Sequence, residues 1–514
     1  MEQSIVQRKQ PAIAGVIAFA YREPGRVVTW LLGLHLVVWT VLPVLVCPNL
    51  QLDLVEGLAL GKEWQLGYWK HPPLPWWIDD LAYRAAGDVH AVYLLGPLAA
   101  AIALYAVWRL GLKITSPQNA LIAVLALEGL HFFNFTAVKF NHDVLQLPLW
   151  ALTGLFVYRA ITSGRTVDWI LSGVWLALAA WTKYSVVALA VPIGLVLLLD
   201  PFARRAWRTS GPYLMAAASL ATFLPHLVWL FENDFLPLQY ADVRARSAMH
   251  WYEWLGFPLR WTASQLFFLL PTIALLAIVL ARSRRNEPPR DAAGAFARRY
   301  VMALALGPFV FVTLVLALLG RLGVAMWGYP LWTFTPLAAV VYFAPTMDAV
   351  RLRLFARACL VVLVGMPAAY AAVELFEPFL RDRPKATQFP GKLLAETVTR
   401  QWREMTGMPL AYVGGADIVS SGAGEFAANT VAVYSPDRPH VVVHGEPALS
   451  PWIDPADLAR RGAVLLWEGP SEMLASLKAT FPRAELQPPL TLPRHTLYPR
   501  SPATVNYAIV PPQR

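Results

Sequence analysis

Long apolar stretches separated by short polar segments fill most of the chain. A helix needs about 20 apolar residues to cross the ~30 Å hydrocarbon core of a membrane. The pattern therefore predicts an α-helical polytopic membrane protein with about eleven helices in the membrane. We expect the spans at 27–46, 89–108, 117–133, 144–161, 167–182, 184–200, 211–231, 263–281, 300–320, 325–345 and 355–376. Two longer gaps, 47–88 and 232–262, are predicted to be outer loops.

The final segment, 379–514, is no longer continuously apolar, and its pattern predicts a small soluble α/β domain. Short runs rich in β-branched residues indicate strands at 409–413, 430–434, 440–443 and 463–467. Helical patterns lie at 391–406, 454–461 and 471–480, and Asp454 before Pro455 is a typical helix cap. The domains expected are thus 1–26, a membrane domain over 27–378, and this segment.

Composition agrees with a membrane protein. The 514 residues are 57% hydrophobic and only 15% charged, whereas soluble proteins carry about 25% charge. The net charge of +10 does not indicate nucleic acid, because the basic residues concentrate in short loops between apolar runs. Two Cys far apart, Cys47 and Cys359, argue against a disulfide framework or thiolate metal site.

The distribution of Lys and Arg predicts the orientation, since basic loops stay in the cytoplasm. With 1–26 in the cytoplasm, alternate loops on that side carry twenty Lys and Arg, against nine in the longer loops on the other side. An odd number of spans then places 379–514 outside. It contains neither a GxGxxG nor a Walker motif.

Four polar clusters fall on the same outer side of this topology. They are Asp53 and Glu56; Lys70 and His71; Asn134, Lys139, Asn141, His142 and Asp143; and Lys183 and Tyr184. Ionisable groups near membrane depth are costly unless paired or hydrated, so they are functional candidates by default. Their convergence from distant loops is more informative than any single cluster.

Each cluster also has a plain structural interpretation. The carboxylates can be solvated loop residues, and the lysines can be cations that reach to the membrane interface. Asp143 can cap the helix that follows it, and Trp76 and Trp77 can be interface anchors. A divalent metal on His71, His142 and Asp143 is conceivable, but no tight HxxxH or HExxH spacing supports it. We therefore assign no metal ligands and no certain cofactor.

Several motifs resemble those of the bacterial glycosyltransferase family 39. These are GT-C membrane enzymes related to protein O-mannosyltransferases and to the lipid A aminoarabinose transferase. The segment Gly67-Tyr-Trp-Lys-His-Pro-Pro-Leu74 resembles the family's G-Y-x-D-H-P-P-L stretch, with Asp53 at the spacing of its leading acid. Looser matches are Lys139-Phe-Asn-His-Asp143, Ala180-Trp-Thr-Lys-Tyr184 and Phe231-Glu-Asn-Asp-Phe235. The resemblance spans about residues 25–345.

One departure from the family concerns the acidic pair. The family places two acids side by side, whereas here Leu54 follows Asp53 and Glu56 comes three positions on. Either residue can therefore be the main carboxylate.

The resemblance implies a sugar donor on a polyprenyl phosphate and transfer with inversion on the periplasmic face of the bacterial inner membrane. The acceptor would be a lipid, glycan or protein of the envelope, as in lipopolysaccharide modification. Cations should meet the leaving phosphate, and a carboxylate should act on the acceptor hydroxyl or steady the charged centre. We expect Asp53, Glu56 and Asp143 as catalytic residues; Lys70, His71, Lys139, Lys183 and Tyr184 at the donor phosphate; and Tyr68, Asn141 and His142 at the sugar or acceptor.

Two alternatives have different consequences. A transporter or flippase of a polyprenyl-linked lipid would need access from both sides of the membrane, whereas these clusters share one side. Another lipid-carrier enzyme, such as an oligosaccharide ligase or a phosphoethanolamine transferase, would transfer a different group. The latter normally has a metal-binding soluble domain, for which 379–514 offers no convincing residue set.

Overall fold

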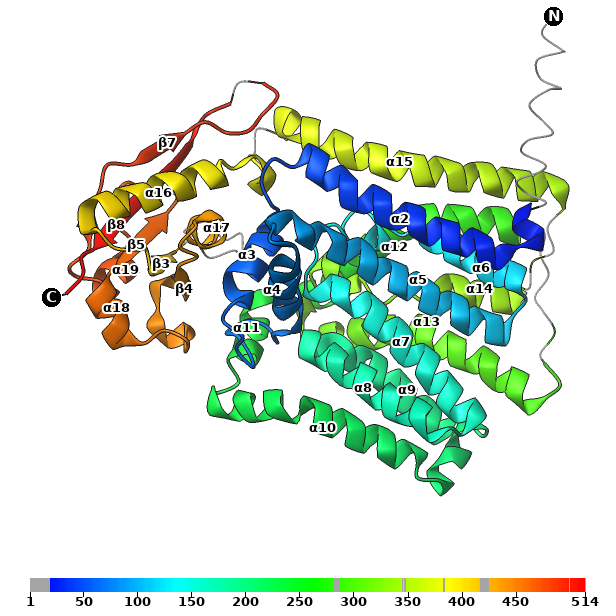
Figure 1. The fold of residues 1–514 in the computed structure, drawn as a ribbon. Coiled ribbons are helices and arrows are strands. Elements are labelled where there is room, and N and C mark those ends of the chain that lie inside the picture. The colour runs from blue at the N-terminus through cyan, green and yellow to red at the C-terminus, as the bar shows by residue number, and fades with distance from the viewer. Residues whose placement is uncertain are drawn as a thin grey trace, which may run out of the picture.

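The computed structural model describes residues 19–281, 287, 289–343, 345, 348–381, 384–416, 425–498 and 500–513. Its long helices run side by side, and the C-terminal unit sits at one end of them (Figure 1). Within this described part, seven helices are long and apolar enough to cross a membrane. They are α2 (Pro24–Val46), α5 (Leu95–Ile114) continued from η1 (Val89–Leu94), α7 (His142–Ser163), α10 (Gly211–Glu232), α12 (Glu253–Leu280), α13 (Ala292–Leu318) and α15 (Ala349–Arg381). The predicted α-helical polytopic fold is confirmed.

Shorter apolar helices occupy the other predicted span positions. They are α6 (Pro117–Leu127), α8 (Thr166–Thr182), η3 (Tyr184–Val186) with α9 (Val187–Leu199), and α14 (Thr335–Phe343). A connecting helix, η4 (Ala203–Arg208), precedes α10.

Two predicted spans are shorter than expected. The helix in the 117–133 span ends at Leu127, and η2 (His131–Phe133) follows. Glu128, the residue after Leu127, lies with its Oε1 3.0 Å from Nδ1 of the buried His35 of α2. In the 325–345 span, only η5 (Ala325–Gly328) precedes Pro330, and α14 starts five residues later. Proline disfavours helix at the residue before it, which explains the break. Residues 344, 346 and 347 lie outside the described part.

The two predicted outer loops contain several helices. They contain α3 (Leu52–Gly61), α4 (Leu74–Ala86) and α11 (Leu236–Arg244), and α12 begins at Glu253 within the second gap. Helices α3 and α4 approach closely because glycines face α4: a Cβ on Gly61 would lie 2.0 Å from the carbonyl oxygen of Trp76. Helix α4 starts with Pro75 in its first turn and ends at Gly87, whose φ of +70° suits a glycine C-cap.

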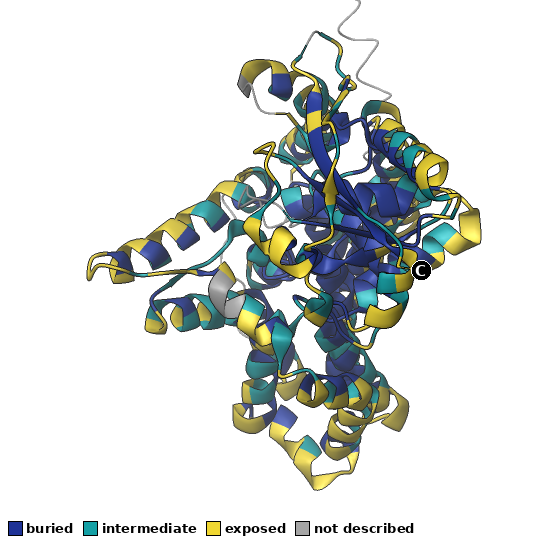
Figure 2. Cartoon of the chain, turned by 90° about the vertical axis from the view of Figure 1, so that its left-hand side faces the viewer, coloured by how far each residue is buried: buried dark blue, intermediate teal, exposed yellow. Residues whose placement is uncertain are grey.

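The C-terminal unit is built on a mixed sheet of order β4-β3-β5-β8-β6, with β7 also paired to β8. Strand β3 is parallel to β4 and β5, and β8 is antiparallel to β5, β6 and β7. The strands are β3 (Tyr412–Gly415), β4 (His440–Val442), β5 (Ala463–Trp467), β6 (Glu485–Leu486), β7 (Leu490–Leu492) and β8 (Ala503–Val510). A separate two-stranded pair joins β1 (Arg246–Ser247) to β2 (Arg321–Leu322). The buried core strands are covered by partly exposed helices (Figure 2).

Four helices accompany this sheet: α16 (Gly391–Thr406), α17 (Phe426–Tyr434), α18 (Pro455–Arg461) and α19 (Ala475–Thr480). Short turns of helix, η6 (Ala386–Gln388), η7 (Val443–Gly445) and η8 (Pro447–Leu449), connect them to the strands. The predicted helix at 391–406 and strand at 463–467 are confirmed, and Asp454 caps α18 by accepting from the Ala456 N–H.

The predicted strand at 430–434 is wrong, because these residues form the second half of α17. Residues 426–433 are all buried, and α17 packs against α3 as well as against the sheet. Tertiary packing on every side therefore overrides the β-propensity of this run.

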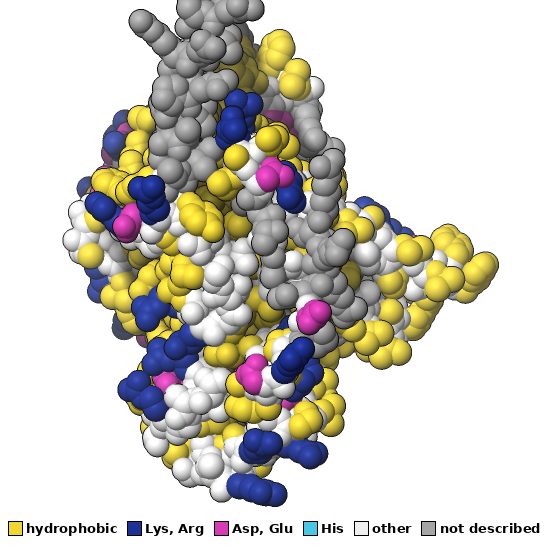
Figure 3. Space-filling view, turned by 90° about the vertical axis from the view of Figure 1, so that its right-hand side faces the viewer, with side chains coloured by type: hydrophobic (Ala, Val, Ile, Leu, Met, Phe, Trp, Pro, Cys, Tyr) yellow, Lys and Arg dark blue, Asp and Glu magenta, His cyan; other side chains and the backbone are white. Residues whose placement is uncertain are grey.

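The C-terminal unit is fixed to the end of the bundle that carries α3 and α4. The Leu50 N–H donates to the Tyr434 hydroxyl at 3.1 Å, and Lys62 donates to the carbonyls of Arg438 and Pro439. The opposite end of the bundle shows many more Lys and Arg than Asp and Glu side chains (Figure 3). Cys47 and Cys359 are both buried and free.

Candidate functional site

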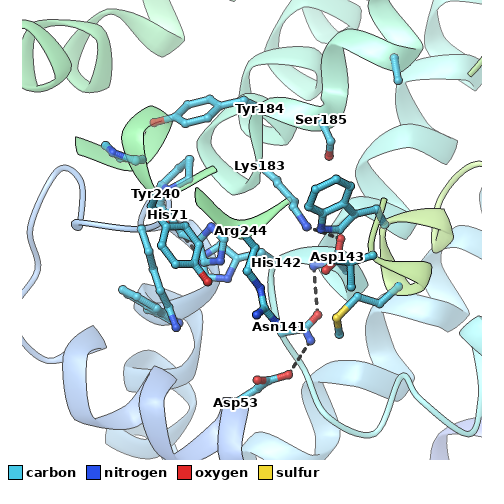
Figure 4. A pocket seen from close by; sticks show the side chains of 18 of the residues that line it. Asp53, His71, Asn141, His142, Asp143, Lys183, Tyr184, Ser185, Tyr240 and Arg244 are labelled. Atoms are coloured by element: carbon cyan, nitrogen blue, oxygen red, sulfur yellow. Dashed lines mark hydrogen bonds and ion pairs between the residues drawn. The ribbon is translucent and has the colours of Figure 1, made fainter. Parts of the chain in front are cut away.

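All four polar clusters contribute to one cavity of about 300 Å³, part of which is seen in Figure 4. The first turn of α3 supplies Asp53, and the loop before α4 supplies Lys70 and His71. The start of α7 supplies His142, and the turn between α8 and α9 supplies Lys183. The predicted site residues that line the cavity are Asp53, Glu56, Lys70, His71, Asn141, His142, Asp143, Lys183 and Tyr184.

Asn141 joins two of these segments. Its Oδ1 accepts from the backbone N–H groups of Asp143 and Val144, both at 3.0 Å, so it caps α7. Its Nδ2 donates to Asp53 Oδ2 at 2.7 Å. Asn141, rather than Asp143, is therefore the cap of α7, and it also orients the Asp53 carboxylate.

Two lysine–carboxylate pairs lie in the cavity wall. Lys70 Nζ contacts Glu56 Oε1, and Lys183 Nζ lies 2.6 Å from Asp143 Oδ1. Lys70 is only 6% exposed and Glu56 7%. Burial alone would lower the pKa of Lys70, but the Glu56 carboxylate together with Tyr240 and Asp53 outweighs it, and the net pKa is raised. Lys70 is therefore a buried cation, and Glu56 compensates its charge.

Two histidine rings lie close together beside these pairs, tilted by 37° to each other. The ring centroids of His71 and His142 are 4.2 Å apart, and His142 Nε2 lies 3.0 Å from the Pro72 carbonyl, to which it donates. Burial, followed by the neighbouring His142 and Lys70, holds the pKa of His71 well below its ordinary value. His71 is thus a neutral imidazole at neutral pH, which can donate or accept a hydrogen bond but adds no charge.

Helix α11 contributes two further residues to the cavity, neither of which was expected from the sequence. Tyr240 and Arg244 line the cavity and point toward it (Figure 4). Within the described part, Arg244 has no ion pair or hydrogen bond, and Asp53 has no cationic partner. In the sequence, Arg244 is one of the nine basic residues assigned to the outer loops. The sequence shows a cation shortly after the Phe231–Phe235 motif. Its position at the cavity could not be inferred, because it depends on how helix α11 packs.

Two predicted residues do not reach the cavity. Tyr68 is fully buried, and its hydroxyl donates to the Leu60 carbonyl at 2.8 Å while its ring packs edge-on against Trp76. It ties the loop to α3 and does not line the cavity. Lys139 is half-buried and does not line the cavity, and Asn134 donates instead to the Glu128 carbonyl.

Two neighbouring tryptophans of α4 have different surroundings. Trp76 is 2% exposed and lines the cavity, whereas Trp77 stacks on Trp64 with ring centroids 5.5 Å apart. In the part of the chain that the structure describes, no three His, Cys, Asp or Glu side chains are grouped to hold a metal.

Comparisons with known proteins agree with the resemblance. Residues 70–229 match the family model described as dolichyl-phosphate-mannose-protein mannosyltransferase. The lipid A galacturonosyltransferase RgtD of Rhizobium johnstonii is 29% identical over 198 residues, which is 38% of this chain and 40% of that protein. The lipopolysaccharide core galacturonosyltransferase RgtB of the same organism is 24% identical over 344 residues, 62% of this chain and 66% of that protein. The matches thus cover less than two thirds of either relative.

Solved structures show the same fold. ArnT from Cupriavidus metallidurans, bound to undecaprenyl phosphate, superposes with a TM-score of 0.59 at 14% identity, covering 94% of this chain and 98% of ArnT. Apo ArnT gives 0.59 at 12% identity, covering 96% and 100%. The resemblance predicted from the sequence is confirmed: the chain is a polytopic membrane protein with the GT-C glycosyltransferase fold and a small C-terminal α/β unit.

Proposed function

We propose that this chain is a glycosyltransferase that moves a sugar from a polyprenyl-phosphate donor to a lipid or glycan of the cell envelope. The observation that carries the proposal is the single cavity in which Asp53, three cations and a neutral histidine converge. ArnT with this fold binds undecaprenyl phosphate, and the curated relatives are named for lipid A and lipopolysaccharide core. These names support the donor and acceptor classes proposed here.

Lys70, Lys183 and Arg244 are the proposed partners of the donor phosphate. Negative charge grows on that phosphate as the sugar leaves, and pre-positioned cations stabilise such charge most in a site that excludes water. Lys70 and Lys183 already have carboxylate partners, which hold their ammonium groups in place. Arg244 has none in the described part, so its charge is available to the phosphate.

Asp53 is the proposed main carboxylate. Lys70 binds Glu56 and Lys183 binds Asp143, whereas Asp53 accepts, among the described residues, only the Asn141 amide. Asp53 can take the proton from an attacking acceptor hydroxyl as the new glycosidic bond forms and the sugar–phosphate bond breaks. Attack opposite the phosphate inverts the anomeric centre. With a phosphate acceptor no base is needed, and Asp53 would then orient the sugar.

The remaining wall of the cavity is apolar and suits the first units of a polyprenyl chain. It includes Trp150, Ala188, Val312, Val324, Met326, Trp327 and Leu331. The proposed site thus pairs a charged head region with an apolar wall, as an amphipathic donor requires.

We also propose that residues 1–26 are cytoplasmic and that 379–514 is a periplasmic domain of a bacterial inner-membrane protein. The positive-inside rule supports this, because the bundle end away from the C-terminal unit is rich in Lys and Arg (Figure 3). Arg8, Lys9, Arg282, Arg284 and Arg285, which also contributed to the prediction, lie outside the described residues.

The test is a transfer assay with the purified full-length protein in liposomes. The donor is polyprenyl-phosphate galacturonic acid labelled in the sugar, and the acceptors are lipid A and lipopolysaccharide core. We expect labelled acceptor and an equal amount of released polyprenyl phosphate. Movement of intact labelled donor between leaflets without cleavage would overturn the proposal in favour of a flippase.

A further inference from the structure

A second cavity, of about 470 Å³, lies between α5, α7 and α8 and has lining residues different from those of the proposed transferase site. Helix α7 contacts both of the other helices and supplies the largest share of the lining. The apolar lining consists of Ile102, Tyr105, Ala106, Leu145, Pro148, Leu149, Leu152, Leu155, Phe156 and Trp175. On α5, Ile102 and Tyr105 are exposed to the surroundings of the bundle. The cavity is therefore an apolar groove that lipid can enter from the side.

The groove extends along α7 toward the basic end of the bundle. Asp143 in the transferase cavity and Arg159 in the groove are sixteen residues apart on one helix. At a rise of about 1.5 Å per residue, this separates them by roughly 24 Å. The charged ends of the two cavities thus lie toward opposite sides of the membrane, whereas the apolar lining of the groove begins at Leu145, close to Asp143.

Three cations line the far end of the groove: Arg109, Lys113 and Arg159. Arg159 is paired with the buried Asp168 at 2.7 Å and packs over Phe156. Arg109 donates to the Tyr105 hydroxyl at 2.7 Å. Within the described part, neither Arg109 nor Lys113 has a carboxylate partner, and no acidic side chain lines the groove. The groove end therefore carries about two uncompensated positive charges.

We propose that this groove binds an anionic diacyl phospholipid, with an acyl chain along α7 and the phosphate between Arg109 and Lys113. An apolar slot ending in free cations is complementary to an amphiphile with a negative head. The bundle end around it is rich in Lys and Arg (Figure 3), as expected for an anionic leaflet. Lipid binding in this groove does not depend on the transfer reaction, so the experiment below tests it independently of the proposed function.

The experiment measures lipid binding to the delipidated full-length protein by native mass spectrometry, titrated with phosphatidylglycerol or phosphatidylcholine. We expect one molecule of phosphatidylglycerol to bind with a clearly higher affinity than further molecules. Phosphatidylcholine should show no such high-affinity binding. The variant Arg109→Ala/Lys113→Ala should weaken that binding by about 10-fold or more, as two juxtamembrane cations are lost. The matched control, Arg204→Ala/Arg205→Ala, removes two exposed arginines of η4 that do not line the groove.

A second pair of variants tests the apolar part. Leu152→Trp fills the groove from α7 and should also weaken phosphatidylglycerol binding, whereas Leu112→Trp, on an exposed position of α5 outside the lining, should not. Thermal unfolding checks that all variants are folded. Equal losses in the groove and control variants would overturn the site. Preferential, Arg109- and Lys113-dependent binding of undecaprenyl phosphate would overturn the assignment to a diacyl lipid.

Discussion

Asp53 is the residue whose side-chain charge we expect to matter most for transfer. It is half-buried, faces the cavity and is held by Asn141 at 2.7 Å, without a cation of its own among the described residues. Asp53→Asn keeps the shape and removes the proton acceptor, so transfer should slow about 100-fold or more. Asp234→Asn is the control, because Asp234 is exposed outside the cavity and Asn tolerates its φ of +50°. Unchanged labelled product with Asp53→Asn would remove Asp53 from the mechanism.

A substitution at Glu56 tests which of the two carboxylates, Asp53 or Glu56, is the main one, a question that the sequence left open. Because it is bound to Lys70, we expect Glu56→Gln to disturb donor binding rather than proton transfer. The turnover rate should fall about 10-fold at most, less than in Asp53→Asn, while the KM for donor changes. Steady-state kinetics with the labelled donor measure both the turnover rate and the KM for donor. A larger fall in turnover with Glu56→Gln than with Asp53→Asn would reverse the assignment.

The neutral state of His71 affects stability as well as chemistry. Its pKa is lowered in the fold, first by burial, so the unfolded chain binds the proton more readily than the folded one. Above the ordinary pKa of about 6.5, His71 is neutral in both states, and its full contribution to the free energy of unfolding is present. As the pH falls below that value, the unfolded chain binds the proton first, and this contribution is lost. We expect the thermal midpoint to drop on acidification from pH 7.5 to 5.5, and to drop less in His71→Gln.

His250→Gln is the matched control for this titration, because His250 is exposed and lies outside the cavity. It should behave as the wild type across the same pH range. If His71→Gln and His250→Gln showed identical acid losses, burial of His71 would not be their source.

At the element scale, the close contact of α3 with α4 positions both the acidic and the basic segment of the site. Asp53 and Glu56 lie on α3, and the Lys70–His71 loop runs directly into α4. Gly61→Ala would place a Cβ 2.0 Å from the Trp76 carbonyl, and backbone cannot move as readily as a side-chain tip. We expect a loss of about 1–3 kcal/mol in stability, seen as a lower thermal midpoint, together with reduced transfer.

Gly256→Ala provides the comparison on α12. No atom lies within 4 Å of a Cβ built there, so the added methyl should be neutral or slightly stabilising by up to about 1 kcal/mol. Equal effects of the two substitutions would mean that the α3–α4 contact is not tight.

Elements with one dominant pattern were predictable from the sequence. The helix at 391–406 has a strongly one-sided apolar face, and the strand at 463–467 is a continuous buried run. The 430–434 run was misassigned because residues 430–433 are all buried, which removes the periodicity that separates helix from strand. Helix α4 was not assigned from the sequence, because Pro72, Pro73 and Pro75 are typical of a loop, although they lead into this helix.

The same limit applies to the site. Convergence of Asp53, Lys70, Asp143 and Lys183 followed from topology alone, because each cluster adjoins a span end on one side. Which lysine pairs with which carboxylate depends on side-chain geometry, and the sequence carries no such information. Arg244 enters the cavity only because α11 folds back over it, a tertiary event without a local signature.

At the scale of the whole molecule, the direction of insertion decides where the proposed transfer takes place. The transferase cavity lies at the end of the bundle with the C-terminal unit, and η4 connects α9 to α10. Glu472 is exposed on the C-terminal unit, and Arg205 is exposed on η4. If basic loops are retained inside, as the positive-inside rule requires, these two positions lie on opposite sides of the membrane.

Single cysteines at these positions test this topology, since the native Cys47 and Cys359 are both buried. In intact cells with a permeabilised outer membrane, Glu472→Cys should react with a membrane-impermeant maleimide. Arg205→Cys should react only after the inner membrane is also opened. Cys47→Ala/Cys359→Ala supplies the unlabelled background. Labelling of Arg205→Cys but not Glu472→Cys in sealed cells would show the opposite orientation. The cavity, and with it the donor and acceptor, would then lie at the cytoplasmic face.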